Sequence, residues 1–339
     1  MNPKIIKALQ YILFLLIGLV LLYFAFRGID LNELMLQIKQ ADYRWVAMSL
    51  VFSVLALVFR AIRWRLLIEP LGKYPKLTNI FHAINIGYLA NFVFPRIGEI
   101  TRCGILNRTD HIPVGKLFGT VIVERIFDML ICALLLCLIL LLRFDVVGNF
   151  IMEHIIRPVM NSMPGIVGIV QLIVITVLVF LIFFVSYRLL WKKLSKTAIM
   201  QKLKNMMRGV LRGIQSVRQI RNFMLFVILN FLIFAMYLLQ TYMMFFALES
   251  TSSLGLVDGL FVLVISSLAL ILPVQGGIGA YHWIISMGLT IFGLTREEGM
   301  VYATISHSVT ALLFILLGAV ALIFVFYGNN KSTNYTNAH

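Results

Sequence analysis

The sequence predicts an all-α polytopic membrane protein, and three observations lead to this class. Of the 339 residues 61% are hydrophobic and only 13% are charged, and the mean hydropathy is +0.96. Soluble domains carry about half apolar and about a quarter charged residues. A helix needs about 20 apolar residues to cross the hydrocarbon core of a bilayer. Uncharged apolar runs of that length recur at 8–26, 164–187, 223–248 and 301–327.

The net charge of +15 points to a membrane surface rather than to nucleic acid as the partner. The segment 188–221 contains ten Lys or Arg residues and no acidic residue, so the positive-inside rule places it in the cytoplasm. Apolar residues recur in it at helical spacing from Leu203 to Val217, which predicts an amphipathic helix on the anionic inner leaflet. We assign 188–222 as a basic cytoplasmic loop, and a regulatory or lipid-gathering role is the alternative to simple anchoring.

Counting spans outward from this loop places both termini in the cytoplasm. Spans at 45–67 and 117–142 bring the number to about six transmembrane helices. The run 8–26 is too long for the apolar region of a signal peptide and is read as a retained span. We therefore expect one flippase-like transmembrane domain over 1–330, a polar cytoplasmic tail over 331–339, and a location in the plasma (inner) membrane.

Two further pairs of apolar segments must each start and finish on one side of the membrane. They are 78–95 with 99–110, and 256–272 with 281–293. These pairs predict two opposed re-entrant helical hairpins, whereas the alternative is a set of ten ordinary spans. Opposed broken helices line substrate sites in transporters that are built from inverted repeats, so an inverted repeat is part of this prediction.

The first hairpin breaks within NFVFPRIGEITR, residues 91–102, where charged residues interrupt an apolar segment. Ionisable groups at membrane depth are costly, so a function is the first hypothesis for them. Arg96 lies in the break, and Glu99 and Arg102 share a face if a helix restarts after Gly98. We expect the arginines to bind phosphate, because a guanidinium makes two hydrogen bonds to one anion. The alternative is a structural ion pair that closes the hairpin.

A second charged cluster lies in VERIFD, where Glu124 and Asp128 share one face of a span beside Arg125. Two carboxylates at that depth need a cation, which Arg96 or Arg102 supplies if the helices pack together. A structural network and proton coupling through Glu124 are the two interpretations of this cluster.

The third charged cluster is RAIRWRLL, with Arg60 and Arg63 near the end of the span 45–67. Snorkelling of these long side chains to the head-group layer explains their position. Binding of a lipid head group by Arg60 and Arg63 is the functional alternative.

The second hairpin breaks within PVQGGIGA, residues 273–280. Glycines permit positive φ and a close backbone approach, and we expect this break to face the first one. Its glycines are Gly276, Gly277 and Gly279. His282 starts the return helix, where a histidine binds phosphate when charged or relays a proton. The alternative for His282 is a core histidine whose ring is hydrogen-bonded within the protein. We interpret His307 as a core histidine of that kind.

No enzyme signature is present in the sequence. It contains no nucleotide-binding glycine loop, no metal-ligand spacing and no nucleophile elbow. The three cysteines form no metal or disulfide pattern. We therefore expect no catalytic residue, no bound metal and no cofactor.

Four motifs, in this order and spacing, resemble the lysylphosphatidylglycerol synthase transmembrane-region family of flippase-like membrane proteins. They are RAIRWRLL (60–67), NFVFPRIGEITR (91–102), VIVERIFDML (121–130) and LPVQGGIGAYHW (272–283). The resemblance covers nearly the whole chain. It implies a domain like the flippase of the multiple peptide resistance factor, which translocates aminoacylated phosphatidylglycerol. The synthase activity of that factor's separate cytosolic domain is not expected, because this chain ends at His339. One departure is His282, where the family commonly has a glutamate.

The motifs and the resemblance together predict a flippase or scramblase for a phospholipid or a polyprenyl-linked lipid intermediate. Arg96 and Arg102 are expected to bind the phosphate, held by Glu99, Glu124 and Asp128. One alternative is a non-transporting accessory or scaffold subunit of a membrane lipid or glycan synthase. Another is an integral-membrane transferase that uses the carboxylate pair with a metal. Two protein partners remain as alternatives: such a synthase, or a second copy of the chain.

Overall fold

The computed structural model describes residues 26–143, 219–269 and 274–336, together with a few single positions outside these ranges. The expected spans 8–26 and 164–187, and nearly all of the basic loop 188–222, lie outside the described residues. The α-helices are α2 (Leu31–Gln40), α3 (Tyr43–Ile68), α4 (Leu77–Val93), α5 (Gly98–Asp110), α6 (Val114–Leu142), α11 (Phe223–Phe245), α12 (Leu256–Ala269), α13 (Ala280–Leu289) and α14 (Arg296–Thr336). Short 3-10 turns are η1 (Glu69–Leu71), η4 (Glu249–Thr251), η5 (Gln275–Gly277) and η6 (Thr290–Phe292). All regular structure in the described ranges is helical, which confirms the all-α class.

Four of the described helices are long and apolar enough to cross a bilayer. They cover Tyr43–Leu71, Val114–Leu142, Phe223–Phe245 and Arg296–Phe326. They correspond to four of the expected spans, namely 45–67, 117–142, 223–248 and 301–327. The chain is therefore an all-α membrane protein with several apolar helices of membrane-spanning length.

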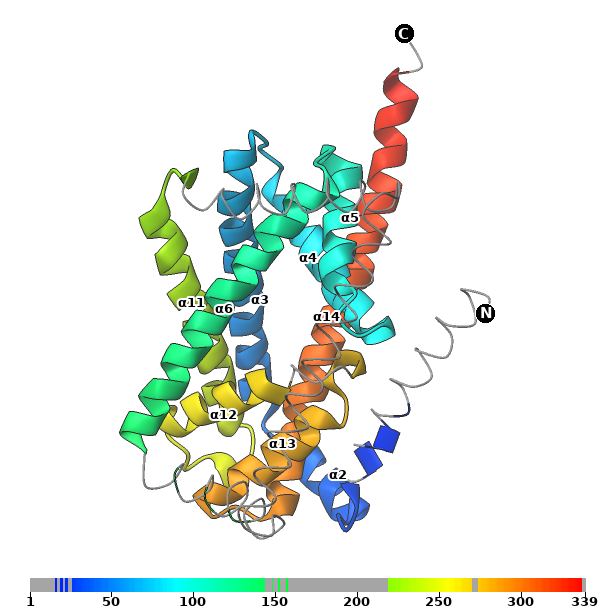
Figure 1. Ribbon diagram of the computed structural model, residues 1–339. Helices are drawn as coiled ribbons and strands as arrows, with labels where there is room; N and C mark the ends of the chain where they lie inside the picture. The colour runs from blue at the N-terminus through cyan, green and yellow to red at the C-terminus, as the bar shows by residue number, and fades with distance from the viewer. Residues whose placement is uncertain are drawn as a thin grey trace, which may run out of the picture.

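Two pairs of shorter helices lie at opposite ends of the bundle (Figure 1). α4 and α5 form a hairpin at the end where α3 finishes, and α12 and α13 lie toward the other end. α5 has 13 residues and α13 has 10. At 1.5 Å per residue these helices are about 20 Å and about 15 Å long, shorter than the hydrocarbon core of about 30 Å.

Polar side chains cap the start of two of the long helices. Asp42 precedes α3 and accepts a hydrogen bond from the amide of Arg44 at 3.0 Å. Asn222 precedes α11 and accepts one from the amide of Leu225 at 3.0 Å. Each cap satisfies an amide in a first turn, which has no carbonyl partner within the helix.

The first break separates α4 from α5. α4 ends at Val93, shortly before Pro95, which lacks an amide hydrogen and cannot continue the helical hydrogen bonds. Arg96 has a φ of 60°, which is uncommon for a residue other than glycine. α5 then begins at Gly98, whose amide donates to the side-chain oxygen of Asn91 at 2.8 Å. The break is therefore held by a side chain of α4.

The second break precedes α13 and is built from glycines with positive φ. The φ values are 58° at Gly276, 79° at Gly277 and 82° at Gly279. A Cβ at Gly276 would lie 2.5 Å from ring atoms of Phe92, which belongs to α4. The second break thus lies directly against the last turn of α4, beside the first break.

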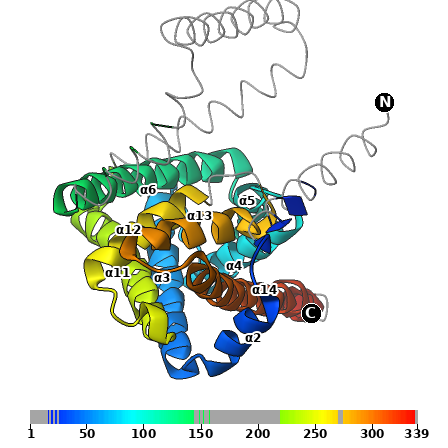
Figure 2. The same ribbon diagram turned by 90° about the horizontal axis from the view of Figure 1, so that it is seen from below.

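The helices pack around two apolar cores. One core is formed where α2, α12, α13, the end of α11 and the start of α14 meet, and it includes Phe245 and Tyr302. The other core is formed by α3, α4, α5, α6, the start of α11 and the far part of α14, and it includes Trp64, Leu106 and Phe226. α3 packs along α11, and α14 packs against both α4 and α13 (Figure 2).

Two glycines allow α4 and α5 to cross closely. A methyl group on Gly98 would overlap the carbonyl oxygen of Gly87 and the side-chain amide of Asn91. A methyl group on Gly87 would in turn meet the carbonyl oxygen of Gly98 at 2.9 Å. Because the obstructing atoms are mainly backbone atoms, they cannot move away without displacing a helix.

We expect Gly98→Ala to lower the stability of the protein by about 1–3 kcal/mol, the usual cost of overpacking a close contact. The matched control is Gly104→Ala on the same helix, where a Cβ meets no atom within 4 Å. Alanine there should be neutral or slightly stabilising, since it is the better helix former. Thermal unfolding of the purified variants in detergent measures both. Equal unfolding midpoints for the two variants would contradict the close crossing.

Candidate functional site

Arginines of α3 meet carboxylates of α6 inside the bundle. The Nη2 atoms of Arg60 and Arg63 both donate to Oε1 of Glu124, each at 2.9 Å. Arg63 Nη1 also donates to Oδ1 of Asp128 at 2.7 Å, and Arg60 Nη2 donates to Oδ2 of Asp128 at 3.2 Å. Arg60 is 7% exposed and Arg63 is fully buried. Snorkelling was therefore the wrong expectation for these two arginines: their side chains are buried inside the bundle against the carboxylates.

α11 supplies neutral polar partners for the same arginines. Arg63 Nη1 donates to Oδ1 of Asn230 at 2.6 Å. Arg60 Nη1 donates to the hydroxyl of Tyr237 at 3.0 Å. Buried charges are tolerated when pairing is combined with additional hydrogen bonds of this kind. α3, α6 and α11 are thus joined at one level of the bundle.

Arg102 adds a third guanidinium to Glu124 from the first hairpin. Its Nη1 lies 2.9 Å from Oε2 of Glu124. Its guanidinium also lies over the ring of Trp64, with 4.5 Å between the guanidinium carbon and the ring centroid, in the arrangement of a cation–π contact. The structure therefore brings together Arg102 and Glu124, as the sequence hypothesis expects, whereas Arg96 is exposed in the break.

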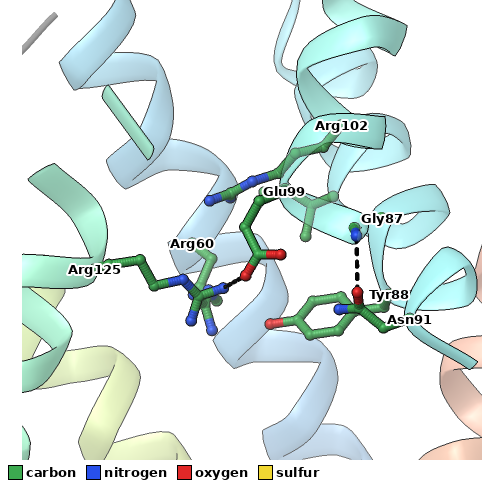
Figure 3. A pocket seen from close by; sticks show the side chains of 9 residues that line it. Arg60, Gly87, Tyr88, Asn91, Glu99, Arg102 and Arg125 are labelled. Atoms are coloured by element: carbon green, nitrogen blue, oxygen red, sulfur yellow. Dashed lines mark hydrogen bonds and ion pairs between the residues drawn. The ribbon is translucent and has the colours of Figure 1, made fainter. Parts of the chain in front are cut away.

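Glu99 and Arg125 form a more exposed pair next to this buried group. Arg125 Nη2 lies 3.0 Å from Oε1 of Glu99, and the two side chains are 46% and 24% exposed. Arg125 Nη1 is also 3.9 Å from Oδ2 of Asp128. Glu99 projects between Arg125 and Arg102 (Figure 3). The pair therefore covers the buried cluster on one side.

The cluster contains more positive than negative groups. Its members are the arginines Arg60, Arg63, Arg102 and Arg125 and the carboxylates Glu99, Glu124 and Asp128. Four guanidinium groups against three carboxylates leave one net positive charge within the described residues. A buried uncompensated charge is costly, so this arrangement favours an anion as an additional partner.

A small pocket lies between the first hairpin, α3 and α6. It is lined by Arg60, Ile84, Gly87, Tyr88, Asn91, Gly98, Glu99, Arg102 and Arg125, several of which are visible in Figure 3. Its volume is about 20 Å³, which accommodates one water molecule. Nε and Nη2 of Arg102 and Oε2 of Glu99 are buried without a hydrogen-bond partner among the described residues. The pocket therefore has unused donors, but a phosphate needs it to widen.

The second break carries a separate polar cluster. His282 is buried, and its ring centroid lies 4.9 Å from that of His307 on α14. His307 Nε2 lies 2.8 Å from the carbonyl oxygen of Gly276. His307 is thus a satisfied histidine, as expected, but its partner is the break itself. None of these three residues, nor Gly277 and Gly279, lines the arginine pocket.

Some site residues escaped the sequence analysis because they carry no charge and match no site pattern. Tyr88, Asn91, Asn230 and Tyr237 belong to this group. The contact between α3 and α6 could have been predicted from the sequence. Two arginines three residues apart share one helix face, as do two carboxylates four residues apart on another span, so the two faces carry opposite charges. Within the described ranges, no three His, Cys, Asp or Glu side chains are grouped to hold a metal ion.

Comparison with known proteins gives partial matches to two curated relatives. A UPF0104 membrane protein of Methanocaldococcus jannaschii is 30% identical over 161 residues, which is 46% of each chain. The glycosyltransferase AglD of Haloferax volcanii is 31% identical over 133 residues, which is 39% of this chain and 21% of that protein. The chain thus matches less than half the length of either relative. No solved structure matches the chain significantly.

The family comparison covers far more of the chain. The family model described as the lysylphosphatidylglycerol synthase TM region matches residues 11–318. This range contains the arginine cluster, both breaks, three of the membrane-length helices described above and most of the fourth, Arg296–Phe326. The chain therefore belongs to the lysylphosphatidylglycerol synthase transmembrane-region family.

Proposed function

We propose that the chain moves a phospholipid or a lipid-linked intermediate between the two membrane leaflets and that it is not an enzyme. One observation carries this proposal: the cluster has one net positive charge, and Arg102, which lines the pocket beside the broken hairpin, has two buried nitrogen donors without a hydrogen-bond partner among the described residues. A phosphate is the anion that every such lipid carries at the membrane surface. Arginine suits it because its planar fork binds phosphate through two hydrogen bonds and stays charged.

Binding would begin with an exchange of anions. The Glu99–Arg125 pair is partly exposed, with 3.0 Å between the two groups, and exposed pairs contribute only about 0–1 kcal/mol. A lipid phosphate can replace the carboxylate of Glu99 at Arg125 and reach Nη2 of Arg102. Displacement of Glu99 would also widen the pocket, which holds only about 20 Å³ when closed. Arg96, exposed in the break, would make the first contact with the head group.

The carboxylates of the cluster have a supporting role in this proposal. Glu124 and Asp128 already accept hydrogen bonds from Arg60 and Arg63. Their oxygens are therefore occupied by cations of the protein, which argues against a metal-dependent transferase built on this pair. They hold the arginines at one level of the bundle so that Arg102 keeps its donors directed at the pocket.

The topology we propose has six spans and two opposed re-entrant hairpins, in the manner of an inverted repeat. α11 begins directly after the basic loop 188–222, so the end of the bundle that holds its start would be cytoplasmic. The hairpin of α4 and α5 would then enter from the cytoplasm, and that of α12 and α13 from outside. Helices of about 15–25 Å, too short for a bilayer, suit this arrangement. The membrane would be the plasma membrane, with both termini inside.

A second candidate is an accessory subunit of a membrane lipid or glycan synthase. It is favoured by the name of the Haloferax relative, a glycosyltransferase of which the match covers only 21%. In that role the domain would hold a synthase, or a second copy of itself, at the membrane. It would tolerate the loss of phosphate donors, and a partner protein would co-purify with it.

We expect Arg102→Gln and Arg125→Gln each to slow lipid translocation in proteoliposomes at least about tenfold, because charged hydrogen bonds contribute about 1.5–3 kcal/mol each. Arg102→Lys should also be impaired, since lysine keeps the charge but loses the fork. The matched control is Arg65→Gln, which removes a 41% exposed arginine paired with Glu69 on the same helix turn. Native mass spectrometry of the same proteins should show a retained lipid that is lost only from the pocket variants.

Three results would distinguish the proposals. Translocation at the wild-type rate by both pocket variants would exclude the arginines as the phosphate site. Wild-type translocation rates in both pocket variants, together with a co-purifying synthase, would favour the accessory role. Impaired translocation with unchanged unfolding midpoints would support the phosphate site directly, because a folding defect would lower the midpoints as well.

Glu124→Gln should lower stability strongly, by about 3–5 kcal/mol, because it leaves three buried guanidinium groups without their shared carboxylate. The double variant Glu124→Gln, Arg63→Gln removes one charge of each sign and should recover part of the loss. Glu69→Gln is the surface control, with an expected change below about 1 kcal/mol. The midpoint of thermal unfolding in detergent measures the stability of all three variants. A stability of Glu124→Gln equal to that of Glu69→Gln would show that the cluster does not hold the bundle together.

A further inference from the structure

The second break contains a pair of histidines whose hydrogen bonding is incomplete. The ring centroids of His282 on α13 and His307 on α14 are 4.9 Å apart, at an interplanar angle of 62°. His282 is 5% exposed, and its Nδ1 has no hydrogen-bond partner among the described residues. Two adjacent imidazoles with an unused ring nitrogen offer a position to which a proton can add.

The tautomer of His307 follows from its partner. A backbone carbonyl only accepts hydrogen bonds, so Nε2 of His307 must donate to the oxygen of Gly276 at 2.8 Å. In a neutral ring Nδ1 then carries no hydrogen and offers a lone pair. A proton added to the pair therefore has a place on His307 Nδ1 or on His282, whereas the bond to Gly276 already holds Nε2.

The surroundings of the pair contain no countercharge in the part of the chain that is described. The facing titratable group is the phenol of Tyr281 on α13, whose ring centroid lies 5.2 Å from that of His307. The phenol of Tyr302 on α14 lies near that of Tyr281. Tyr281 contacts the hydroxyl of Ser306 at 3.2 Å. α4 contributes Phe92 across the break, the segment before α2 contributes Phe26, and no charged side chain acts on either histidine. A proton on the pair would be an isolated positive charge.

The pair is linked to the first hairpin through one glycine. Gly276 presents its carbonyl to His307 and its Cα to the ring of Phe92 at the end of α4. Phe92 follows Asn91, which lines the arginine pocket and holds the amide of Gly98. Any movement of Gly276 away from α4 therefore loosens the contact between the two breaks.

We propose that His282 and His307 form a proton-binding site that controls the contact between the two breaks. The neutral pair holds the contact closed, because His307 fixes the carbonyl of Gly276 beneath Phe92. A bound proton places a charge where only phenols, a hydroxyl and a carbonyl surround it, and water stabilises that charge when the contact opens. Acidification thus opens the break. If the proposed function holds, lipid translocation becomes pH-dependent through this pair, and this last step rests on that function.

The test measures the distance between the two breaks without measuring transport. Spin labels are placed at two exposed sites that flank the contact, Val93→Cys and Ile278→Cys, in a chain whose cysteines are replaced by alanine. The distance distribution is recorded in lipid nanodiscs from about pH 8 to about pH 5, which brackets the usual titration of imidazole. We expect a second, longer distance to grow as the pH falls.

Matched variants separate proton binding from a structural effect. His307→Gln keeps an N–H donor for the carbonyl of Gly276 but takes up no proton, and His282→Asn keeps a polar group at the position of Nδ1. The double variant should lose the longer distance at every pH. His82→Asn removes a histidine of α4 that stacks on Phe324 outside the cluster, and it should behave like the parent protein.

An unchanged distance in the parent protein across this pH range would overturn the proposal, as would an equal shift in the double variant. Translocation by the same proteins is measured separately. A pH-dependent distance in a protein that moves no lipid would support the proton site and reject the transport function. A pH-independent distance in a protein that moves lipid would reject the proton site and support the transport function.

Discussion

The arrangement of this bundle depends on one buried carboxylate. Glu124 has no exposed surface and is paired with three guanidinium groups, two from α3 and one from α5. Without it the arginines would repel one another, and without the arginines its charge would be too costly to bury. This mutual dependence joins α3 to α5 and α6, which follow it in the chain only after α4. It also connects a membrane-length helix pair to the first broken hairpin, so that the pocket has one rigid wall.

The two sides of the pocket differ in how firmly their charged groups are held. Arg60 and Arg63 are held by carboxylates and by Asn230 and Tyr237, which leaves them no freedom to follow a lipid. Glu99 and Arg125, by contrast, form a partly exposed pair that solvent screens. Under the proposed function, the site binds and then releases an anion, which needs both kinds of contact. The buried network gives the site its net positive charge, and the exposed Glu99–Arg125 pair is the contact that an incoming anion could replace.

Much of the architecture could be predicted from the sequence, because membrane helices leave strong signals. Apolar length located the four described spans, and Pro95 with the glycines after Val274 located both breaks. The link from Arg102 to Glu124 followed from the need of a buried carboxylate for a cation. The position of Arg60 and Arg63 was mistaken because an arginine near a span end fits the surface as well as the interior. Only the packing of α3 against α6 and α11 decides between a surface and an interior position. The sequence of a single span does not show which helices pack against it.

The long helix α14 has a consequence for how the two hairpins are spaced. Gly299 packs on the backbone of Ser286 in α13, and Gly318 packs on Leu89 and the backbone of Asn85 in α4. Gly318 follows Gly299 by 19 residues, which corresponds to about 28 Å along a helix axis. α14 therefore packs on the two hairpins at two points whose spacing is close to the thickness of the hydrocarbon layer, about 30 Å. A single residue inserted between Gly299 and Gly318 would turn one of these glycines by about 100° away from its hairpin.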